Sequence, residues 1–230
     1  TGKLSDVVTS SFYASHIITG AGFGGIVCFN SYDLYSRAKL LRGWGRSSTL
    51  FNEKEDILKR FNTKVDGIPY DGKYIFSEMG YNFLPSEISA AFALEQLKKI
   101  KKNISIRIKN FKYLSNFFKK YIDIFSLPKQ NKNIKTGWLA FPLIIKNKKI
   151  KRQDLQIFLE KKNIQTRTIF TGNILRQPIM KKRKYKKVQY AEINSNNIMK
   201  NGILIGCHHG LKNKDLEYIK KNFLNFFKKK

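Results

Sequence analysis

The chain has 230 residues, of which 42% are hydrophobic and 13% aromatic, and it carries a formal net charge of +29. This composition excludes an intrinsically disordered chain, and the length allows one large or two small folded domains. No apolar run approaches the roughly 18 residues that span a bilayer, and residues 1–6, TGKLSD, lack both the charged and the apolar region of a signal peptide. We therefore expect no membrane segment, no membrane partner and a cytoplasmic location.

The positive charge is spread along the whole chain. Lysines occur in short runs at residues 98–102, 146–151, 181–187 and 228–230, together with abundant asparagine and isoleucine. A charge of this size is typical of proteins that bind nucleic acid, but its spread favours a bias of the whole composition over one basic face. We expect no nucleic acid partner; a nucleic-acid or polyanion-binding module is an alternative that rests on charge alone. The same field would attract an anionic substrate.

The chain begins with a predicted pair of strands. Residues 7–13 and 25–29 have the β-branched and aromatic content of strands, and residues 14–24 form the connection between them. Residues 31–44 then show apolar side chains at helical spacing, with Ser31 as the N-cap. This order predicts a strand, a turn, a strand and a helix.

A long polar segment follows, over residues 46–77. Within it, residues 53–60 predict a short helix and residues 67–72 a turn; segments of this length are usually functional or mobile. A strong helical pattern starts at Pro85 and extends to Tyr121. It fits either two consecutive helices or one bent helix.

The second half alternates between strand and helix patterns. The predicted elements are a strand at 138–145, a helix at 152–162, a strand at 164–169, a helix at 191–199, a strand at 202–206 and an amphipathic helix at 213–227. Such an order predicts a small α/β domain with its own core. Because Pro, Gln, Asn and Lys replace the apolar pattern over residues 123–135, we divide the chain into domains 1–125 and 126–230.

Candidate functional residues are few when the residues are considered alone. His16 follows a strand, where sites tend to be built, but a lone histidine there is more often structural or on the surface. His208 and His209 are adjacent, so they do not face one way on regular structure and are not expected to bind a metal. Cys28 and Cys207 show no metal-ligand spacing. We therefore expect no metal site.

The stretch SFYASH at residues 11–16, followed by glycines and an apolar strand, resembles the cofactor-anchoring segment of the DegT/DnrJ/EryC1/StrS family of sugar aminotransferases. These enzymes use pyridoxal 5'-phosphate. In that family, the sixth position of the motif beginning with Ser11 is usually the lysine that holds the cofactor covalently, and here it is His16. In this respect the chain is similar to the histidine-containing branch, the pyridoxamine 5'-phosphate (PMP)-dependent NDP-4-keto-6-deoxyhexose 3-dehydratases.

The resemblance implies an α/β fold, that of fold type I PLP-dependent transferases. It covers the C-terminal part of the large cofactor-binding domain and a small α/β C-terminal domain. By this comparison the 230 residues match only the second half of a family member. The chain is then either a fragment of a longer protein or one of two chains that together make up a family member. An inactive fragment is one alternative to an active enzyme.

The resemblance also implies roles for residues of the first domain. Ser11 matches the serine that hydrogen-bonds the cofactor phosphate. Asn82, in the motif GYN, matches an asparagine that reaches the phosphate of the neighbouring subunit, which implies a homodimer with shared active sites. His16 would be the general base, because an imidazole can take up a proton near neutral pH. The implied reaction is 3-dehydration of a nucleotide-linked 4-keto-6-deoxyhexose in deoxysugar or lipopolysaccharide biosynthesis.

Further matches lie in the second domain. WLAFP at residues 138–142 resembles a family strand, and residues 167–178 resemble a segment that contributes to substrate recognition. Arg167 and Arg176 would bind the nucleotide-sugar diphosphate or a glutamate carboxylate, although either could instead serve a structural ion pair. His208 and His209 resemble an HH pair of the cluster-free dehydratases, which implies that one of them faces the substrate.

The segment after Trp44 distinguishes the iron-sulfur members of the dehydratase branch from the cluster-free ones. WGR at residues 44–46 resembles the iron-sulfur members, but residues 47–60 contain no cysteine, so we expect no iron-sulfur cluster. Two routes are left for restoring the cofactor amine: glutamate as amino donor, or a partner that supplies electrons differently. The other alternative is a PLP-dependent nucleotide-sugar aminotransferase of the same fold, which requires a lysine at position 16.

Overall fold

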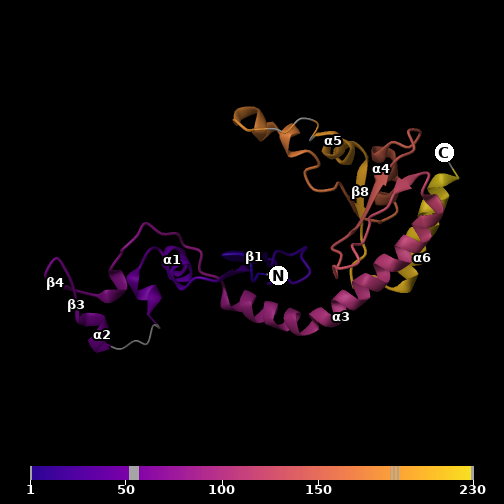
Figure 1. The fold of residues 1–230 in the computed structure, drawn as a ribbon. Helices are drawn as coiled ribbons and strands as arrows, with labels where there is room; N and C mark the ends of the chain where they lie inside the picture. The colour runs from indigo at the N-terminus through magenta and orange to yellow at the C-terminus, as the bar shows by residue number, and fades with distance from the viewer. Residues whose placement is uncertain (1, 52–56, 187, 189, 191, 229–230) are drawn as a thin grey trace. The chain divides into compact units, whose positions relative to one another are not determined.

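The computed structural model describes residues 2–51, 57–186, 188, 190 and 192–228. The chain forms two compact units, Thr1–Lys98 and Lys99–Lys230, and Figure 1 shows the elements of each. The predicted division into domains 1–125 and 126–230 stays a prediction. The boundary between the units falls inside helix α3 (Glu87–Phe118), because the apolar face of the later part of this helix packs into the core of the second unit.

The first unit starts with the predicted strand pair and helix. Strands β1 (Val7–Ser11) and β2 (Gly25–Phe29) pair antiparallel, with Ser11 opposite Gly25. Helix α1 (Tyr32–Arg42) follows, and the Ser31 hydroxyl accepts a hydrogen bond from the Leu34 N–H at 3.4 Å. The predicted N-cap is thus confirmed.

The polar segment contains more regular structure than predicted. Its elements are a 3₁₀ turn η1 (Ser47–Leu50), helix α2 (Ile57–Phe61), strands β3 (Thr63–Val65) and β4 (Ile68–Tyr70), and a 3₁₀ turn η2 (Gly72–Tyr74). The turn predicted over residues 67–72 was wrong for residues 68–70, which pair with β3. The reversal lies at Asp66 and Gly67, whose φ angles of 50° and 81° suit a tight hairpin. Of the helix predicted at 53–60, residues 53–56 lie outside the described residues and the rest is helical.

Two glycines allow the backbone to cross itself in the first unit. A Cβ atom added to Gly45 would lie 1.9 Å from the carbonyl oxygen of Glu78, and one added to Gly80 would lie 2.1 Å from the amide nitrogen of Gly45. Gly45 also has a φ of 76°, which favours glycine. Arg37 reinforces the crossing through an ion pair with Glu78 at 2.7 Å. The WGR and GYN segments are therefore fixed against each other.

Helix α3 (Glu87–Phe118) is one uninterrupted helix of 32 residues, which decides between the two alternatives for this region. A short 3₁₀ turn, η3 (Lys119–Tyr121), follows it. The side chains of Leu114 and Phe118 are completely buried. Among the helices of the described ranges, none is both long and apolar enough to cross a membrane.

The second unit is built on a four-stranded antiparallel sheet in the order β5-β6-β8-β7. Its strands are β5 (Phe125–Ser126), β6 (Phe141–Ile145), β7 (Thr166–Arg167) and β8 (Gly202–Ile205). Its helices are α4 (Arg152–Glu160), α5 (Glu192–Asn201) and α6 (Asn213–Phe227). Two 3₁₀ turns, η4 (Ile174–Arg176) and η5 (Pro178–Lys182), lie between β7 and α5. The predicted elements are present, but β6 starts at Phe141 and not at the predicted residue 138, and β7 is shorter than the predicted 164–169. Strand β5 was not predicted, because two residues carry no periodicity.

A continuous aromatic and aliphatic core holds this sheet against its helices. Figure 1 shows α6 beside the C-terminal half of α3, where the ring centroids of Phe118 and Phe223 are 4.9 Å apart. The largest fully buried side chains are Phe118, Phe125, Phe141, Phe223, Leu114, Leu143, Leu155, Leu159, Ile203, Ile205, Leu216 and Cys207. The helical spacing of apolar residues in α6 places that face in the core, as its sequence predicted.

Two polar side chains of α3 fix loops of the second unit. Arg107, only 4% exposed, donates from one terminal nitrogen to the carbonyls of Trp138 at 3.1 Å and Leu139 at 3.2 Å. Asn110 donates to the His208 carbonyl at 2.9 Å. Partial burial lowers the pKa of His208, and the nearby charge of Arg107 lowers it further. The pKa of His209 is lowered by the same two causes.

The glycine crossing gives a stability prediction. Gly45→Ala should lower the free energy of unfolding by about 3 kcal/mol, because it adds both a backbone clash and an unfavourable φ. Gly67→Ala is the matched control: its φ is 81°, but nothing lies within 4 Å of the added Cβ, so a loss of about 1 kcal/mol is expected. Urea unfolding measures the free energy of unfolding of both variants. Equal losses of stability in the two variants would contradict the close backbone crossing at Gly45.

The histidine pair gives a pH prediction. Because the folded-state pKa values lie below the ordinary value of 6.5, the unfolded chain takes up protons first on acidification. The free energy of unfolding should therefore fall as pH drops from about 7.5 to about 5.5. The double variant His208→Asn/His209→Asn should show a smaller fall in urea unfolding over that range. An unchanged slope in the variant would show that these histidines are not linked to folding.

Candidate active site

The turn between β1 and β2 is held by its own backbone. The Phe12 N–H donates to the Gly24 carbonyl at 3.0 Å, and the Gly20 N–H donates to the Phe12 carbonyl at 2.8 Å. A Cβ at position 20 would lie 2.3 Å from the Phe23 carbonyl oxygen, so this position requires glycine. The glycines of this stretch thus close a compact turn that presents the residues between β1 and β2.

His16 is fixed within this turn by two hydrogen bonds. Its N–H donates to the Tyr13 carbonyl at 3.0 Å, and its side-chain Nδ1 lies 3.0 Å from the carbonyl oxygen of Ser11. A carbonyl oxygen can only accept, so the proton of the neutral imidazole resides on Nδ1 and the lone pair on Nε2. The imidazole is exposed, and the Tyr13 ring meets it edge-on, with centroids 6.2 Å apart. Nε2 is therefore an oriented proton acceptor.

Ser11 lies at the end of β1, directly beside this imidazole. Its hydroxyl oxygen accepts a hydrogen bond from the Tyr13 N–H at 3.2 Å, which leaves the hydroxyl proton available for donation. The side chain is exposed. Ser11 and His16, two residues singled out from the sequence, are thus brought together by the carbonyl of Ser11.

Asn82 is positioned by the backbone of the α1 C-terminus. It forms an isolated β-bridge with Gly43. On either side of it, the Tyr81 N–H donates to the Leu41 carbonyl at 2.7 Å and the Phe83 N–H donates to the Arg42 carbonyl at 3.0 Å. Asn82 is exposed. Within the described part of the chain, no hydrogen bond joins Asn82 to Ser11 or His16.

Arg46 is a further candidate that the motif WGR did not reveal. Its guanidinium carbon lies 4.6 Å from the Trp44 ring centroid and 5.6 Å from those of Tyr74 and Phe76. Its buried Nε has no hydrogen-bond partner among the residues that are described. A guanidinium held by aromatic rings with an unused Nε donor suits a phosphate or carboxylate. Sequence could not find this cage, because the two outer rings come from a distant segment.

The two arginines of the second unit occupy different surroundings. Arg167, on β7, donates to the carbonyl of its neighbour Thr166 at 2.7 Å. Arg176 donates from Nε to the side-chain oxygen of Asn196 on α5, which also accepts from Asn173 at 2.8 Å. Neither arginine forms a salt bridge with a carboxylate in the described ranges. The structural ion pair that the sequence allowed is not seen there.

His208 and His209 follow β8 in an exposed loop. The Nδ1 of His208 accepts from the Gly210 N–H at 3.2 Å, so neutral His208 carries its proton on Nε2 and can donate from it. Over the described ranges, no group of three or more His, Cys, Asp or Glu side chains could hold a metal ion. Nε2 of His208 is therefore a neutral hydrogen-bond donor near physiological pH.

Comparison with known proteins places this arrangement in a family. The model of the DegT/DnrJ/EryC1/StrS aminotransferase family matches residues 1–223. The lipopolysaccharide biosynthesis protein RfbH of Salmonella typhimurium is 33% identical over 230 residues, covering 98% of this chain and 52% of that protein. GDP-4-keto-6-deoxy-D-mannose 3-dehydratase of Yersinia pseudotuberculosis is 32% identical over 225 residues, covering 96% of this chain and 53% of its own length.

A solved structure agrees with these matches. That of the Escherichia coli GDP-4-keto-6-deoxy-D-mannose-3-dehydratase with bound hydrated PLP is similar with a TM-score of 0.78 at 27% identity, covering 96% of this chain and 55% of that one. The predicted α/β fold, that of the PLP-dependent aminotransferase-like enzymes, is confirmed. The chain spans about half the length of the curated relatives it matches. It belongs to the DegT/DnrJ/EryC1/StrS aminotransferase family.

Proposed function

We propose that the full-length protein is a PMP-dependent 3-dehydratase of a nucleotide-linked 4-keto-6-deoxyhexose, in deoxysugar or lipopolysaccharide biosynthesis. The observation that carries this proposal is His16, which stands where the family usually has the cofactor-binding lysine. Its Nδ1 is held by the Ser11 carbonyl and its Nε2 is free to act as a base. The names of the Salmonella and Yersinia relatives support the pathway and the reaction.

The residues of the first unit fit a phosphorylated pyridine cofactor. Ser11 has a hydroxyl proton to offer to a phosphate oxygen, because its hydroxyl oxygen accepts from the Tyr13 N–H and donates to no group in the described ranges. Asn82 presents an exposed amide from a rigid backbone segment. When bound, PMP supplies a primary amine for the keto group at C4 and a conjugated ring that accepts electrons. The Escherichia coli neighbour with bound hydrated PLP is consistent with this fit.

His16 would move the proton that the reaction requires. Nε2 takes up a proton while Nδ1 keeps its hydrogen bond to the Ser11 carbonyl, which stabilises the imidazolium that forms. An imidazole does not hold the cofactor covalently as a lysine amine does, so the cofactor would be bound by noncovalent contacts. Dehydration at C3 rather than transamination is the expected outcome.

Asn82 would act across a homodimer interface, so that each active site contains residues from both subunits. Among the residues described, it forms no hydrogen bond with Ser11 or His16 of its own chain, which agrees with a role toward the partner. Arg167 and Arg176 would bind the nucleotide-sugar diphosphate or a glutamate carboxylate. Of His208 and His209, one would donate a hydrogen bond to the substrate.

The cofactor amine would be restored by glutamate. Residues 47–60 contain no cysteine, so this segment offers no thiolate ligands for an iron-sulfur cluster. A partner that supplies electrons differently is the other route. Assays with and without glutamate distinguish the two.

The second candidate function is a PLP-dependent nucleotide-sugar aminotransferase. It is favoured by more distant relatives, such as the GDP-perosamine synthase of Caulobacter vibrioides, which is 29% identical over 106 residues. It requires an amine at position 16 that can bind the cofactor covalently. The imidazole of His16 is the observation against it.

Replacing His16 tests the proposed base. His16→Asn in the full-length protein should reduce loss of the C3 hydroxyl by about 10²–10⁴-fold, because a positioned base contributes about that factor. Product formation is followed by mass spectrometry with PMP and a GDP-4-keto-6-deoxyhexose, and thermal unfolding checks that the variant is folded. Unchanged turnover would exclude His16 as the base.

Borohydride reduction tests the alternative function. The native protein should give no covalent cofactor adduct, whereas His16→Lys should give one, because only the lysine amine reacts reversibly with the cofactor aldehyde. Intact mass measures the adduct. Trapping in the native protein would favour the aminotransferase.

Subunit mixing tests the shared site. His16→Asn and Asn82→Ala are each expected to inactivate the homodimer, but a mixed dimer contains one site with both residues intact. Random reassociation should therefore restore about a quarter of wild-type activity. If Asn82 acts within its own subunit, no activity returns.

A further inference from the structure

A basic hollow lies in the second unit, and none of the residues assigned above lines it. It is formed by the loop after β6, the start of α4 and the end of α5, and its volume is about 760 Å³. This size is within the roughly 300–1,000 Å³ of small-molecule sites. Ile145 and Ile150, both nearly buried, contribute apolar surface to it.

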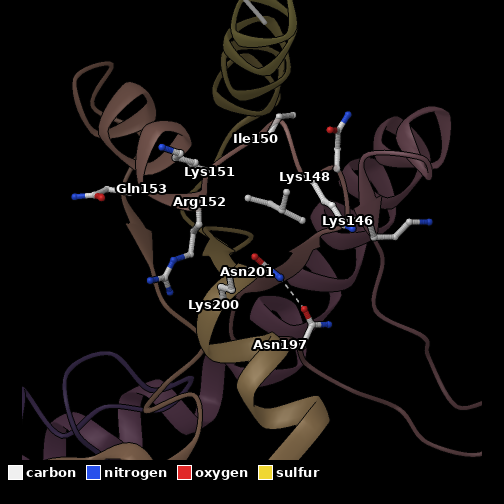
Figure 2. A pocket seen from close by; sticks show the side chains of 11 residues that line it. Lys146, Lys148, Ile150, Lys151, Arg152, Gln153, Asn197, Lys200 and Asn201 are labelled. Carbon is white, nitrogen blue, oxygen red and sulfur yellow. Dashed lines mark hydrogen bonds between the residues drawn. The ribbon is translucent and has the colours of Figure 1, made fainter.

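Cations dominate the lining of this hollow. Five of its eleven lining residues are lysine or arginine, compared with 45 of 230 in the whole sequence, and no carboxylate lines it. Figure 2 shows these side chains coming from three elements. They are Lys146 and Lys148 from the loop, Lys151 and Arg152 from the start of α4, and Lys200 from the end of α5. The hollow is thus richer in cations than the lysine bias of the chain explains.

These cations are not neutralised within the described ranges. None of the five forms a salt bridge with a carboxylate there. Asp154, the nearest carboxylate in sequence, is in the first turn of α4 but does not line the hollow. Like charges brought together without counter-charge repel one another. A bound anion would relieve this repulsion.

Unused hydrogen-bond donors add to the charge. The Nε of Arg152 is buried and has no hydrogen-bond partner in the described part of the structure, a state that costs free energy. The first turn of α4 has no side-chain cap at Lys151, so its backbone N–H groups are not satisfied in that way. On the α5 side, Asn201 donates to Asn197 at 2.7 Å, as the dashed line in Figure 2 shows.

We propose that this hollow is a binding site for a small anion that carries at least two phosphate groups. Five cations exceed what one phosphate neutralises, and their arrangement around a concavity suits a compact ligand. Duplex nucleic acid instead needs cations along an extended face to follow its phosphates. The inference is independent of the proposed dehydratase activity, because the two sites share no residue.

Calorimetric titration of the full-length protein with inorganic pyrophosphate tests the site. Lys148→Ala/Lys151→Ala should weaken binding by about tenfold for each lost charge-assisted contact. The matched control is Lys161→Ala/Lys162→Ala, which removes the same charge from exposed positions just after α4. It should change the affinity by less than about twofold.

If both double variants lose the same affinity for pyrophosphate, the loss reflects the overall charge of the protein and the proposed site is wrong. The proposal is also wrong if the wild-type protein does not bind pyrophosphate. Hydrogen–deuterium exchange gives a second readout: pyrophosphate should slow exchange in peptides covering residues 146–153 and 197–201. If a short DNA duplex binds more tightly than pyrophosphate and loses the same affinity in the pocket variant, the small-ligand assignment is wrong. Matching thermal unfolding of both variants excludes misfolding as the cause.

Discussion

The candidate active site depends on one hydrogen bond, between Nδ1 of His16 and the carbonyl oxygen of Ser11. It decides which imidazole nitrogen carries the proton, because a carbonyl accepts and never donates. It also joins the proposed base to the proposed phosphate-binding serine. The bond exists because the turn folds back on itself, with glycine required at position 20. The orientation of the proposed base and of the proposed phosphate-binding serine thus rests on the same few backbone contacts.

Rigidity elsewhere comes from close backbone contacts and from polar side chains that hold loops by their backbone carbonyls. In the first unit, Gly45 and Gly80 bring two backbone segments together at distances that exclude a Cβ, and this crossing orients the segment that bears Asn82. In the second unit, the buried guanidinium of Arg107 and the amide of Asn110 hold the loops before β6 and after β8 to α3. Each unit therefore fixes its candidate residues through backbone groups.

The two units differ in how completely they bury apolar surface. The second has a continuous core, whereas the β1–β2 hairpin of the first exposes 49% of Ile26 and 52% of Val27. A two-stranded hairpin is marginally stable by itself in water. The hairpin is therefore expected to be stabilised when further apolar surface covers it. Lysine and arginine occur along the whole sequence, but five of these cations line one hollow.

The sequence by itself determined the long periodic elements and the presence of an imidazole, not a lysine amine, at position 16. The N-cap at Ser31 and the limits of α6 follow from local pattern, and the SFYASH motif identified the turn that bears His16. Only the tertiary structure decided the β3–β4 hairpin, the two-residue β7, the aromatic cage of Arg46 and the contact of Arg176 with Asn196. Local periodicity and capping are properties of neighbouring residues. The tautomer of an imidazole, the rings around a guanidinium and the cations around a hollow depend on segments that meet only when the chain folds.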